Sequence, residues 1–583
     1  MKRKSVNKYL DYIFDGAFGT YFASKYGIDK PCELANISMS DKVIAIHEEY
    51  IKAGVNAIKT NTFRLNSSLI DNENYRNLLI KKAIKNAREA INHKNVNIFG
   101  DIGPINIGDD NEHEYLEIVK VFEKCGVKNF IFETNIEYES LLEAINYIKN
   151  NIQDSKVIVS FGVNQDGYTQ LGYYYLDLCH KLKGLVDYFG LNCICGPTHM
   201  YQLATKLDTL NYNIALMPNA GYPEINSVPL FNYNPDYFSD ILLKMTSLDI
   251  KVIGGCCGST PAHMEAYINK INHIKIDYVK PIEQKVIKIK YHNKIIKMFN
   301  NHQKVIATEL ETPLDLDTDY LYEACFLYQK YGSDLITLVD SPLGKTRADS
   351  LLIASRIKSE LKIDIVPHLT CRDKNQIALK GGLLGANICG INNILALSGD
   401  AVAQIDREVS KGVFNFNSFN LISYISNLNN DIFNEYPYLI AGALNVNSSK
   451  FDNELKRALK KIDCGVNYFI TQSIFTKEAI ENLKKAKKVL NKPILAGLYP
   501  VASYRNALFL NNEVKGIKIP DELIKALSEA KKDDYFKISL NFIKDIINKI
   551  APYCDGYYLS TPLRKHDYVI DIIKYIKGNN HDD

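Results

Sequence analysis

Three of the twelve cysteines lie where a short apolar run meets a turn. Cys193 closes the run at residues 188–193, and the adjacent pair Cys256 and Cys257 closes the run at residues 252–257. Neighbouring cysteines rarely bond to each other because the bridge is strained, whereas flanking glycines allow a tight turn to direct both sulfurs to one point. Three thiolates suit zinc, and a fourth position left open is typical of a catalytic site.

An open position on zinc would bind a substrate thiol, which would lose its proton near neutral pH and could then attack a methyl group. The same cysteines also fit buried thiols or a redox pair, and spacing alone leaves these interpretations open. Cys195 is an alternative ligand that lies past the predicted strand end.

These cysteines belong to eight apolar runs that alternate with helix-like stretches, at residues 12–15, 57–60, 96–101, 129–133, 157–160, 188–193, 214–219 and 252–257. A second series of eight lies at residues 305–309, 335–339, 363–368, 394–400, 438–442, 468–472, 494–498 and 556–559. The pattern predicts an α/β protein with two consecutive (β/α)8 TIM-type barrels, although a doubly wound sheet would alternate similarly. In such barrels the active site lies at the carboxyl ends of the strands.

Length and composition agree with two domains, because the chain has 583 residues of which 46% are hydrophobic. We predict a first barrel at residues 1–273, a linker with an entry helix at residues 274–303 and a second barrel at residues 304–583. A net charge of +3 does not indicate a surface that binds nucleic acid. Without a convincing signal peptide or an apolar run that could cross a membrane, we expect a cytoplasmic protein.

Motifs in the first half follow one another in a characteristic order, at residues 14–20, 60–63, 100–104, 132–135, 190–193, 196–197, 218–221 and 254–258. This set resembles the zinc-dependent homocysteine S-methyltransferases. The resemblance implies that Cys193, Cys256 and Cys257 are zinc ligands. It also implies that Asp15 and Glu133 help to hold the amine of homocysteine, although either carboxylate taken alone fits a helix cap or a local ion pair.

The second half carries polar residues at predicted strand ends, namely Glu309, Thr337, His368, Thr370, Asp400 and Gln472. Each of them singly fits a cap or a buried hydrogen-bonding group. A glutamate at the end of a first barrel strand could act as a general acid if its site raises its pKa. No Gly-x-Gly-x-x-Gly sequence follows a strand, so a Rossmann dinucleotide site is not indicated.

The motifs at residues 308–313, 367–371, 397–400, 469–472 and 497–501 together resemble methylenetetrahydrofolate reductase, a flavin-carrying barrel. The resemblance implies that Glu309 protonates the folate nitrogen, that Asp400 contacts folate and tunes the flavin, and that Gln472 contacts the pterin. The residues that it places at FAD are Thr337, His368, Gly399, Asp400 and Lys461. The flavin supplies the hydride, and we expect NAD(P)H as the electron donor.

The second half also departs from the reductase pattern. Residues 401–404 stand where related fused proteins carry a proline-rich segment with a lysine, and Ser398 stands where single-domain reductases carry an arginine. Ser473 follows the predicted pterin contact, and Glu311 is a second carboxylate on the same side of the predicted strand as Glu309. These differences leave the flavin and folate contacts of the loop open.

A methyltransferase followed by a reductase resembles bifunctional proteins of bacteria that combine the two. We therefore expect a one-carbon enzyme that makes methionine from homocysteine and reduces 5,10-methylenetetrahydrofolate to 5-methyltetrahydrofolate. The alternative is a methyltransferase that uses a sulfonium donor, S-methylmethionine or S-adenosylmethionine, with a degenerate or partner-docking reductase half. A corrinoid protein partner and a homo-oligomer remain open alternatives, and the sequence does not identify the methyl donor.

Overall fold

The structure is a computed structural model that describes residues 9–28, 30–105, 111–223, 231, 233–278, 293–400, 412–514 and 516–578. The chain divides into two compact units, Met1–Lys285 and Val286–Asp583, and each is described by itself. Residues 279–292 of the predicted linker and residues 401–404 of the loop lie outside the described residues. The domain limits at residues 273 and 304 therefore stay a prediction.

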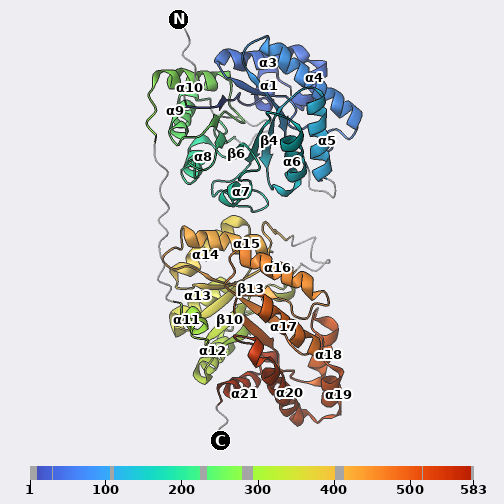
Figure 1. Ribbon diagram of the computed structural model, residues 1–583. Coiled ribbons are helices and arrows are strands. Elements are labelled where there is room, and N and C mark those ends of the chain that lie inside the picture. The colour runs from blue at the N-terminus through green and yellow to red at the C-terminus, as the bar shows by residue number, and fades with distance from the viewer. Residues whose placement is uncertain are drawn as a thin grey trace. The chain divides into compact units, whose positions relative to one another are not determined.

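Among its described residues, the first unit contains eight strands that alternate with helices (Figure 1). The strands are β1 (Tyr12–Ile13), β2 (Ala57–Lys59), β3 (Asn97–Ile102), β4 (Asn129–Asn135), β5 (Lys156–Phe161), β6 (Tyr188–Asn192), β7 (Ile214–Met217) and β8 (Val252–Ile253). The helices are α1 (Gly19–Tyr26), α2 (Ala35–Ser38), α3 (Ser40–Ala53), α4 (Glu73–Ile91), α5 (Asn111–Lys124), α6 (Leu142–Asn151), α7 (Tyr175–Lys181), α8 (Pro197–Ala204), α9 (Pro235–Thr246) and α10 (Pro261–His273).

The strands of the first unit are all parallel and follow the order β1-β8-β7-β6-β5-β4-β3-β2. An isolated parallel bridge between Phe14 and Ala57 joins the two ends of this sheet. Nearly all strand residues are buried, as expected for parallel strands covered on their outer face by helices and filled with side chains inside. The sheet therefore closes into a barrel.

The described part of the second unit also contains eight parallel strands, which form a closed barrel in the order β10-β11-β12-β13-β14-β15-β16-β9. The strands are β9 (Val305–Glu311), β10 (Leu335–Val339), β11 (Ile365–Thr370), β12 (Asn393–Leu397), β13 (Leu439–Leu444), β14 (Tyr468–Ser473), β15 (Ile494–Leu498) and β16 (Gly556–Ser560). The helices are α11 (Lys294–Asn300), α12 (Asp319–Tyr331), α13 (Ser350–Leu361), α14 (Gln376–Ile388), α15 (Ser418–Asn430), α16 (Phe451–Asp463), α17 (Lys477–Val489), α18 (Tyr504–Glu513), α19 (Asp521–Glu529), α20 (Tyr535–Ile550) and α21 (His566–Lys577).

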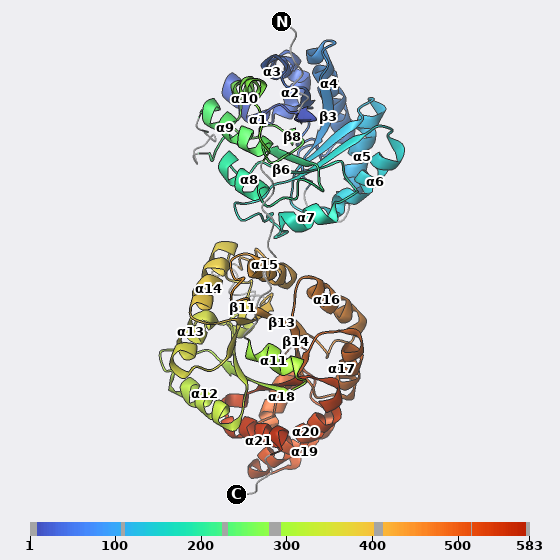
Figure 2. The same ribbon diagram turned by 60° about the vertical axis from the view of Figure 1, so that its left-hand side comes forward.

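Helix α11 falls within the stretch that the sequence assigned to a linker and an entry helix, and it packs against the second barrel. Ile295 is fully buried in one cluster with Val305, Leu335 and Leu439, which lie at the amino ends of their strands. In Figure 2, α11 lies at the middle of the ring formed by the other helices of this unit. The helix therefore covers the amino end of the barrel and leaves the carboxyl end for the site.

The helices of both units follow from their local sequence. Asn72 caps α4 and Asn417 caps α15, because each side-chain oxygen accepts a hydrogen bond from a backbone N–H in the first turn, at 3.0 Å in both cases.

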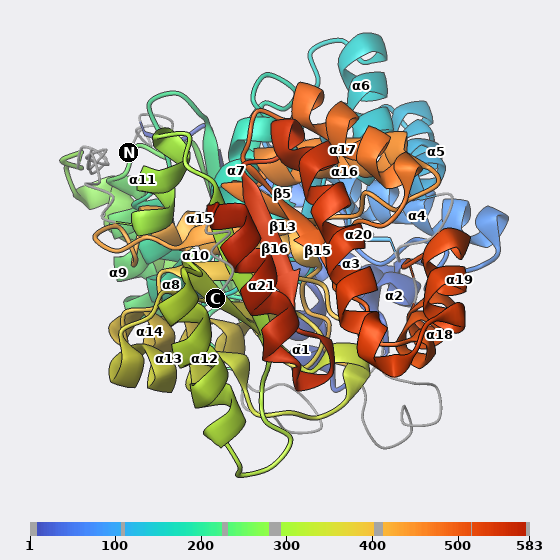
Figure 3. The same ribbon diagram turned by 90° about the horizontal axis from the view of Figure 1, so that it is seen from below.

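Outside the second barrel, helix α21 packs against both α12 and α20 (Figure 3).

The prediction of two consecutive (β/α)8 barrels is confirmed, and the doubly wound alternative is wrong because both sheets close on themselves. Among the described helices, none has both the length and the apolar character that crossing a membrane would require.

Candidate functional site

A cavity of about 630 Å³ opens at the carboxyl end of the first barrel. Its wall is built from residues that follow or end β1, β2, β3, β4, β6 and β8. The side chains that line it include Asp15, Lys59, Asp101, Glu133, Cys193, Cys256 and Cys257. The barrel thus brings the five residues that the sequence predicted for the first site into one cavity.

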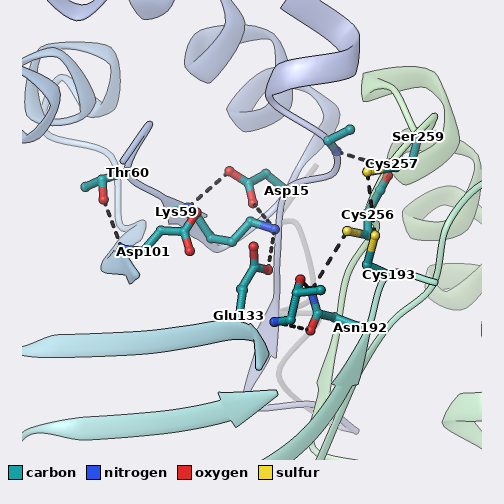
Figure 4. Close-up of polar contacts among 12 residues, drawn as sticks. Asp15, Lys59, Thr60, Asp101, Glu133, Asn192, Cys193, Cys256, Cys257 and Ser259 are labelled. Carbon is teal, nitrogen blue, oxygen red and sulfur yellow. Dashed lines mark hydrogen bonds and ion pairs between the residues drawn. The ribbon is translucent and has the colours of Figure 1, made fainter. Parts of the chain in front are cut away.

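The three predicted zinc ligands lie together at this cavity. The Sγ atoms of Cys193, Cys256 and Cys257 are all within 4.8 Å of one another, and those of Cys193 and Cys257 are 3.7 Å apart. Asn192 Nδ2 lies 3.9 Å from the Cys256 sulfur (Figure 4). Three convergent sulfurs are the donor set of a tetrahedral zinc site that keeps its fourth position for a ligand. The residues present therefore fit zinc.

Backbone geometry directs the sulfurs to this point. Cys193 leaves strand β6 with a φ of 56°, in the left-handed region that costs a non-glycine residue free energy. At Gly255, which precedes the cysteine pair, a Cβ would lie only 2.3 Å from Ser259 Oγ. That hydroxyl donates to the carbonyl oxygen of Cys256 over 2.7 Å and fixes the turn. The close approach explains why glycine is needed there.

The three thiols share hydrogen bonds, so their protonation is linked. Contacts with the other two sulfurs lower the pKa of Cys193, and the contact with Cys193 in turn raises the pKa values of Cys256 and Cys257. A thiolate beside two further sulfurs favours a bound cation. Cys195 stands outside the cluster, since its thiol donates to the carbonyl of Val163 over 3.1 Å.

Beside the cysteines, a buried lysine links the two carboxylates that the resemblance assigned to the substrate amine. Lys59 Nζ lies 2.9 Å from Glu133 Oε1 and 3.9 Å from Asp15 Oδ1. The backbone N–H of Lys59 donates to Asp15 Oδ2 over 3.1 Å. Figure 4 shows the ammonium between the two carboxylates, with the cysteines beyond it.

Burial perturbs every charge in this group. It raises the pKa of Asp15 to about 7 against the opposing attraction of Lys59. It also raises the pKa of Glu133 and, well above its usual range, that of Asp101. For Lys59, burial lowers the pKa, but the carboxylates of Glu133 and Asp15 outweigh it and the net change is a rise. The lysine therefore stays charged within a group of three carboxyls.

Lys59 is a site residue that the sequence analysis did not single out. It ends the apolar run of β2, where its long side chain runs into the barrel rather than out to solvent, and it is only 6% exposed. A lysine closing an otherwise apolar strand was the available signal, because buried lysines are rare unless paired.

A second cavity, of about 330 Å³, lies at the carboxyl end of the second barrel. Glu309, Gln472 and Tyr558 line it, together with apolar side chains from β12, β14 and the segment after α18. Tyr558 donates a short hydrogen bond to Glu309 Oε2. Burial raises the pKa of Glu309, and this hydrogen bond opposes the rise. A carboxyl with a raised pKa suits a general acid.

The tyrosine hydroxyl also connects two of the predicted FAD contacts. Thr337 Oγ1 donates to it over 3.3 Å, and His368 Nε2 lies 3.4 Å from it. Both residues are buried, and burial lowers the pKa of His368 to about 3, so its ring is neutral. Tyr558 was missed from the sequence because a tyrosine inside a strand is more often a packing residue.

The remaining predicted contacts of the second barrel differ in burial, and of Lys461, Gly399, Asp400 and Gln472 only Gln472 lines this cavity. Lys461 is buried on α16, donates to the carbonyl of Ala443 over 2.6 Å, and has no carboxylate within 4.0 Å among the described residues. Burial lowers its pKa. Gly399 has a φ of 86°, and the exposed Asp400 follows it with its carbonyl oxygen 3.3 Å from Arg372 Nη1. Gln472 is exposed at the cavity.

Among the residues that the resemblance assigns to a flavin dinucleotide, Lys461 offers a buried ammonium that the carbonyl of Ala443 holds and that has no carboxylate within 4.0 Å in the described part of the chain. Such a cation suits an anionic group such as a phosphate. Residues 401–404 of the altered loop are outside the described residues. Ser398 Oγ accepts a hydrogen bond from the backbone N–H of Ser418 over 3.2 Å, so it serves the cap region of α15.

Glu311 and Glu309 lie in different environments. It is exposed and pairs with Arg347, whose Nη2 lies 2.6 Å from Glu311 Oε2. Thr370, the other strand-end residue noted in the sequence, donates to Asp340 Oδ2 over 2.9 Å. The carboxyl that meets the buried network of the barrel is therefore Glu309.

Comparison with known proteins matches each unit to a different family. Residues 12–271 match the family model for homocysteine S-methyltransferase, and residues 294–576 match the model for methylenetetrahydrofolate reductase. Among solved structures, the metallated form of the homocysteine methyltransferase MmuM from Escherichia coli is similar to part of this chain. It is 18% identical, has a TM-score of 0.37, and the match covers 45% of this chain and 96% of that one.

Two curated relatives match parts of the chain. Methylenetetrahydrofolate reductase 2 of Schizosaccharomyces pombe is 28% identical over 229 residues, which cover 36% of this chain and 35% of the relative. Methionine synthase of Mycobacterium tuberculosis is 24% identical over 441 residues, which cover 67% of this chain and 36% of the relative. The chain thus spans about a third of the length of each of these relatives. Residues 12–271 belong to the homocysteine S-methyltransferase family, and residues 294–576 belong to the methylenetetrahydrofolate reductase family.

Proposed function

We propose that this chain is a bifunctional one-carbon enzyme. The first barrel transfers a methyl group to homocysteine to give methionine, and the second reduces 5,10-methylenetetrahydrofolate to 5-methyltetrahydrofolate with FAD and a reduced nicotinamide. The observation that carries the proposal is the convergence of three cysteine sulfurs within 4.8 Å, in a cavity that also holds buried carboxylates. The two family matches support the pairing of activities.

In the first barrel, Cys193, Cys256 and Cys257 would hold zinc, which when bound lowers the pKa of a thiol ligand and makes it a nucleophile. Asp15 and Glu133 would bind the ammonium of homocysteine. Their burial strengthens such an ion pair because little water competes for the charges. The 630 Å³ cavity leaves room for the amino acid between the carboxylates and the sulfurs.

In the second barrel, Glu309 would donate a proton to the folate nitrogen as the methylene bridge opens. Its raised pKa keeps the carboxyl protonated closer to neutral pH than an ordinary glutamate. A bound flavin supplies the hydride for the reduction. Thr337, His368, Gly399, Asp400 and Lys461 are the residues that we assign to it. Gln472, at the edge of the cavity, would contact the pterin.

The test is a donor and acceptor screen on the purified full chain. Zinc content and the flavin spectrum are measured first. Homocysteine is then offered with 5-methyltetrahydrofolate, S-methylmethionine or S-adenosylmethionine, and methionine is measured. Oxidation of NADH or NADPH by 5,10-methylenetetrahydrofolate is followed separately.

We expect zinc, a flavin spectrum, methionine from at least one donor, and reduction of the folate. Zinc-loaded protein that makes no methionine from any donor would contradict the assignment of the first barrel. Flavin-loaded protein that does not reduce the folate would contradict that of the second. Methionine from a sulfonium donor alone, with no flavin bound, would favour a methyltransferase with a degenerate reductase half.

A further inference from the structure

The carboxylates proposed to bind the substrate ammonium already bind an ammonium from the chain itself. Lys59 Nζ lies 2.9 Å from Glu133 Oε1 and 3.9 Å from Asp15 Oδ1, in the position that a substrate amine would need (Figure 4). A second cation cannot share the same carboxylate oxygens without strong repulsion at such short range. Substrate binding at this point therefore requires Lys59 to move.

The cavity offers the lysine another carboxylate. Asp101 lines the same cavity, and its charge is among those that raise the pKa of Lys59. Its Oδ1 atom is buried and has no hydrogen-bond partner among the described residues. The Oδ1 atom of Asp15 is likewise without a hydrogen-bond partner. Buried acceptors are normally satisfied, so these two atoms mark places where a donor is missing.

We propose that Lys59 is a positioning residue that exchanges places with the substrate ammonium. In the empty site its ammonium bridges Asp15 and Glu133. When homocysteine binds, the substrate ammonium takes this position and Lys59 turns to Asp101. The inference rests on the proposed function of the first barrel and specifies how its amine subsite works.

The exchange has a physical advantage over a subsite without a lysine. Three buried carboxyls with no cation nearby would take up protons, because burial disfavours their charged form. The tethered ammonium keeps at least one pair ionised and hydrogen-bonded before substrate arrives. The charged groups that face Lys59 are Asp15 after β1, Asp101 on β3, Glu133 on β4 and Cys256 after β8. The cost is competition, since the substrate must displace an internal ion pair.

The test is a double-mutant cycle on homocysteine binding, measured by calorimetry with the zinc-loaded full chain and no methyl donor. The single variants are Lys59→Met and Asp101→Asn, and the double variant combines them. We expect Lys59→Met to bind homocysteine about tenfold more tightly, or ~1.4 kcal/mol, because no internal cation is displaced. Asp101→Asn should bind about tenfold more weakly, because the displaced lysine loses its partner. In the Lys59→Met background, Asp101→Asn should have no effect.

Two controls test whether the change in affinity depends on the substrate amine and on Lys59. The first is 4-mercaptobutanoate, which has the same thiol and carboxylate as homocysteine but no amine, and its affinity should not change across the four proteins. The second is Lys25→Met, which removes an exposed ion pair with Glu49 in the same unit and should leave homocysteine binding unchanged. Lys59→Gln, which keeps a hydrogen-bond donor, replaces Lys59→Met if that variant unfolds.

Weaker homocysteine binding in both Lys59→Met and Lys59→Gln, with zinc retained, would overturn the exchange and indicate a lysine that contacts the substrate directly. An Asp101→Asn effect of equal size in both backgrounds would overturn it as well. If wild-type protein with zinc binds neither thiol, the proposed function of the first barrel fails instead. The two failures are therefore distinguishable.

Discussion

The hydrogen bond from Tyr558 to Glu309 allows a quantitative prediction for the reductase half. Tyr558→Phe removes the hydroxyl and keeps the ring that packs inside the barrel. In the wild type, burial raises the pKa of Glu309, and the bond from Tyr558 lowers it by stabilising the carboxylate. The variant should therefore have a Glu309 pKa that is higher still.

The size of this shift follows from the two forms of the carboxyl. A hydrogen bond to an ionised group contributes ~1.5–3 kcal/mol, and one to a neutral group ~0.5–1.5 kcal/mol. The difference of ~1–1.5 kcal/mol corresponds to about one pKa unit. Glu309 acts in its protonated form, so activity falls as pH rises through its pKa. The falling limb of the pH profile should move to higher pH by about one unit in Tyr558→Phe.

The assay is steady-state reduction of 5,10-methylenetetrahydrofolate across the neutral and alkaline range, with the flavin content of each sample measured. Tyr557→Phe is the matched control, because Tyr557 is the adjacent residue on β16 and does not line the cavity of Glu309. Its profile should coincide with that of the wild type. A limb that stays in place in Tyr558→Phe, with flavin bound and activity measurable, would refute the role of Glu309 as the acid.

Three further predictions concern single residues. Cys256→Ser should lose most of its zinc in metal analysis, whereas Cys195→Ser, whose thiol lies outside the cluster, should keep it; equal zinc in both would refute the ligand assignment. Glu309→Gln should lose reductase activity by about 10²–10⁴-fold, whereas Glu311→Gln, at an exposed ion pair, should change it little, and the reverse ranking would exchange their roles. Burial lowers the pKa of His47 to about 4, so the folded state excludes a proton that the unfolded state binds. Stability should fall as pH drops from about 6.5 towards 4, and His47→Leu should flatten this dependence by up to ~1.4 kcal/mol per pH unit in unfolding experiments.

Much of the architecture was predictable because it depends on local pattern. Parallel strands covered on both faces give continuous apolar runs, so both sets of eight strands could be located from the sequence. The sequence predicted an entry helix between the two barrels but not where it packs. The packing of Ile295 against the amino ends of strands of the second unit places α11 on that barrel.

Some residues of the candidate sites could be predicted from the sequence, and others could not. The sequence identified Cys193, Cys256 and Cys257 because the end of each strand could be read locally, and all such ends meet at one face of a barrel. It did not identify Lys59 or Tyr558 as site residues. Each lies within an apolar strand, and its role depends on carboxylates that are distant in the chain.

The sequence by itself determined the fold class, the order of the two families and the residue types of both sites. Only the tertiary structure decided which charges meet, that Lys59 lies between Asp15 and Glu133, and that Glu309 rather than Glu311 joins the buried network. The physical reason is that strand patterns are set by neighbouring residues, whereas electrostatic partners are set by burial and by distances across the closed barrel.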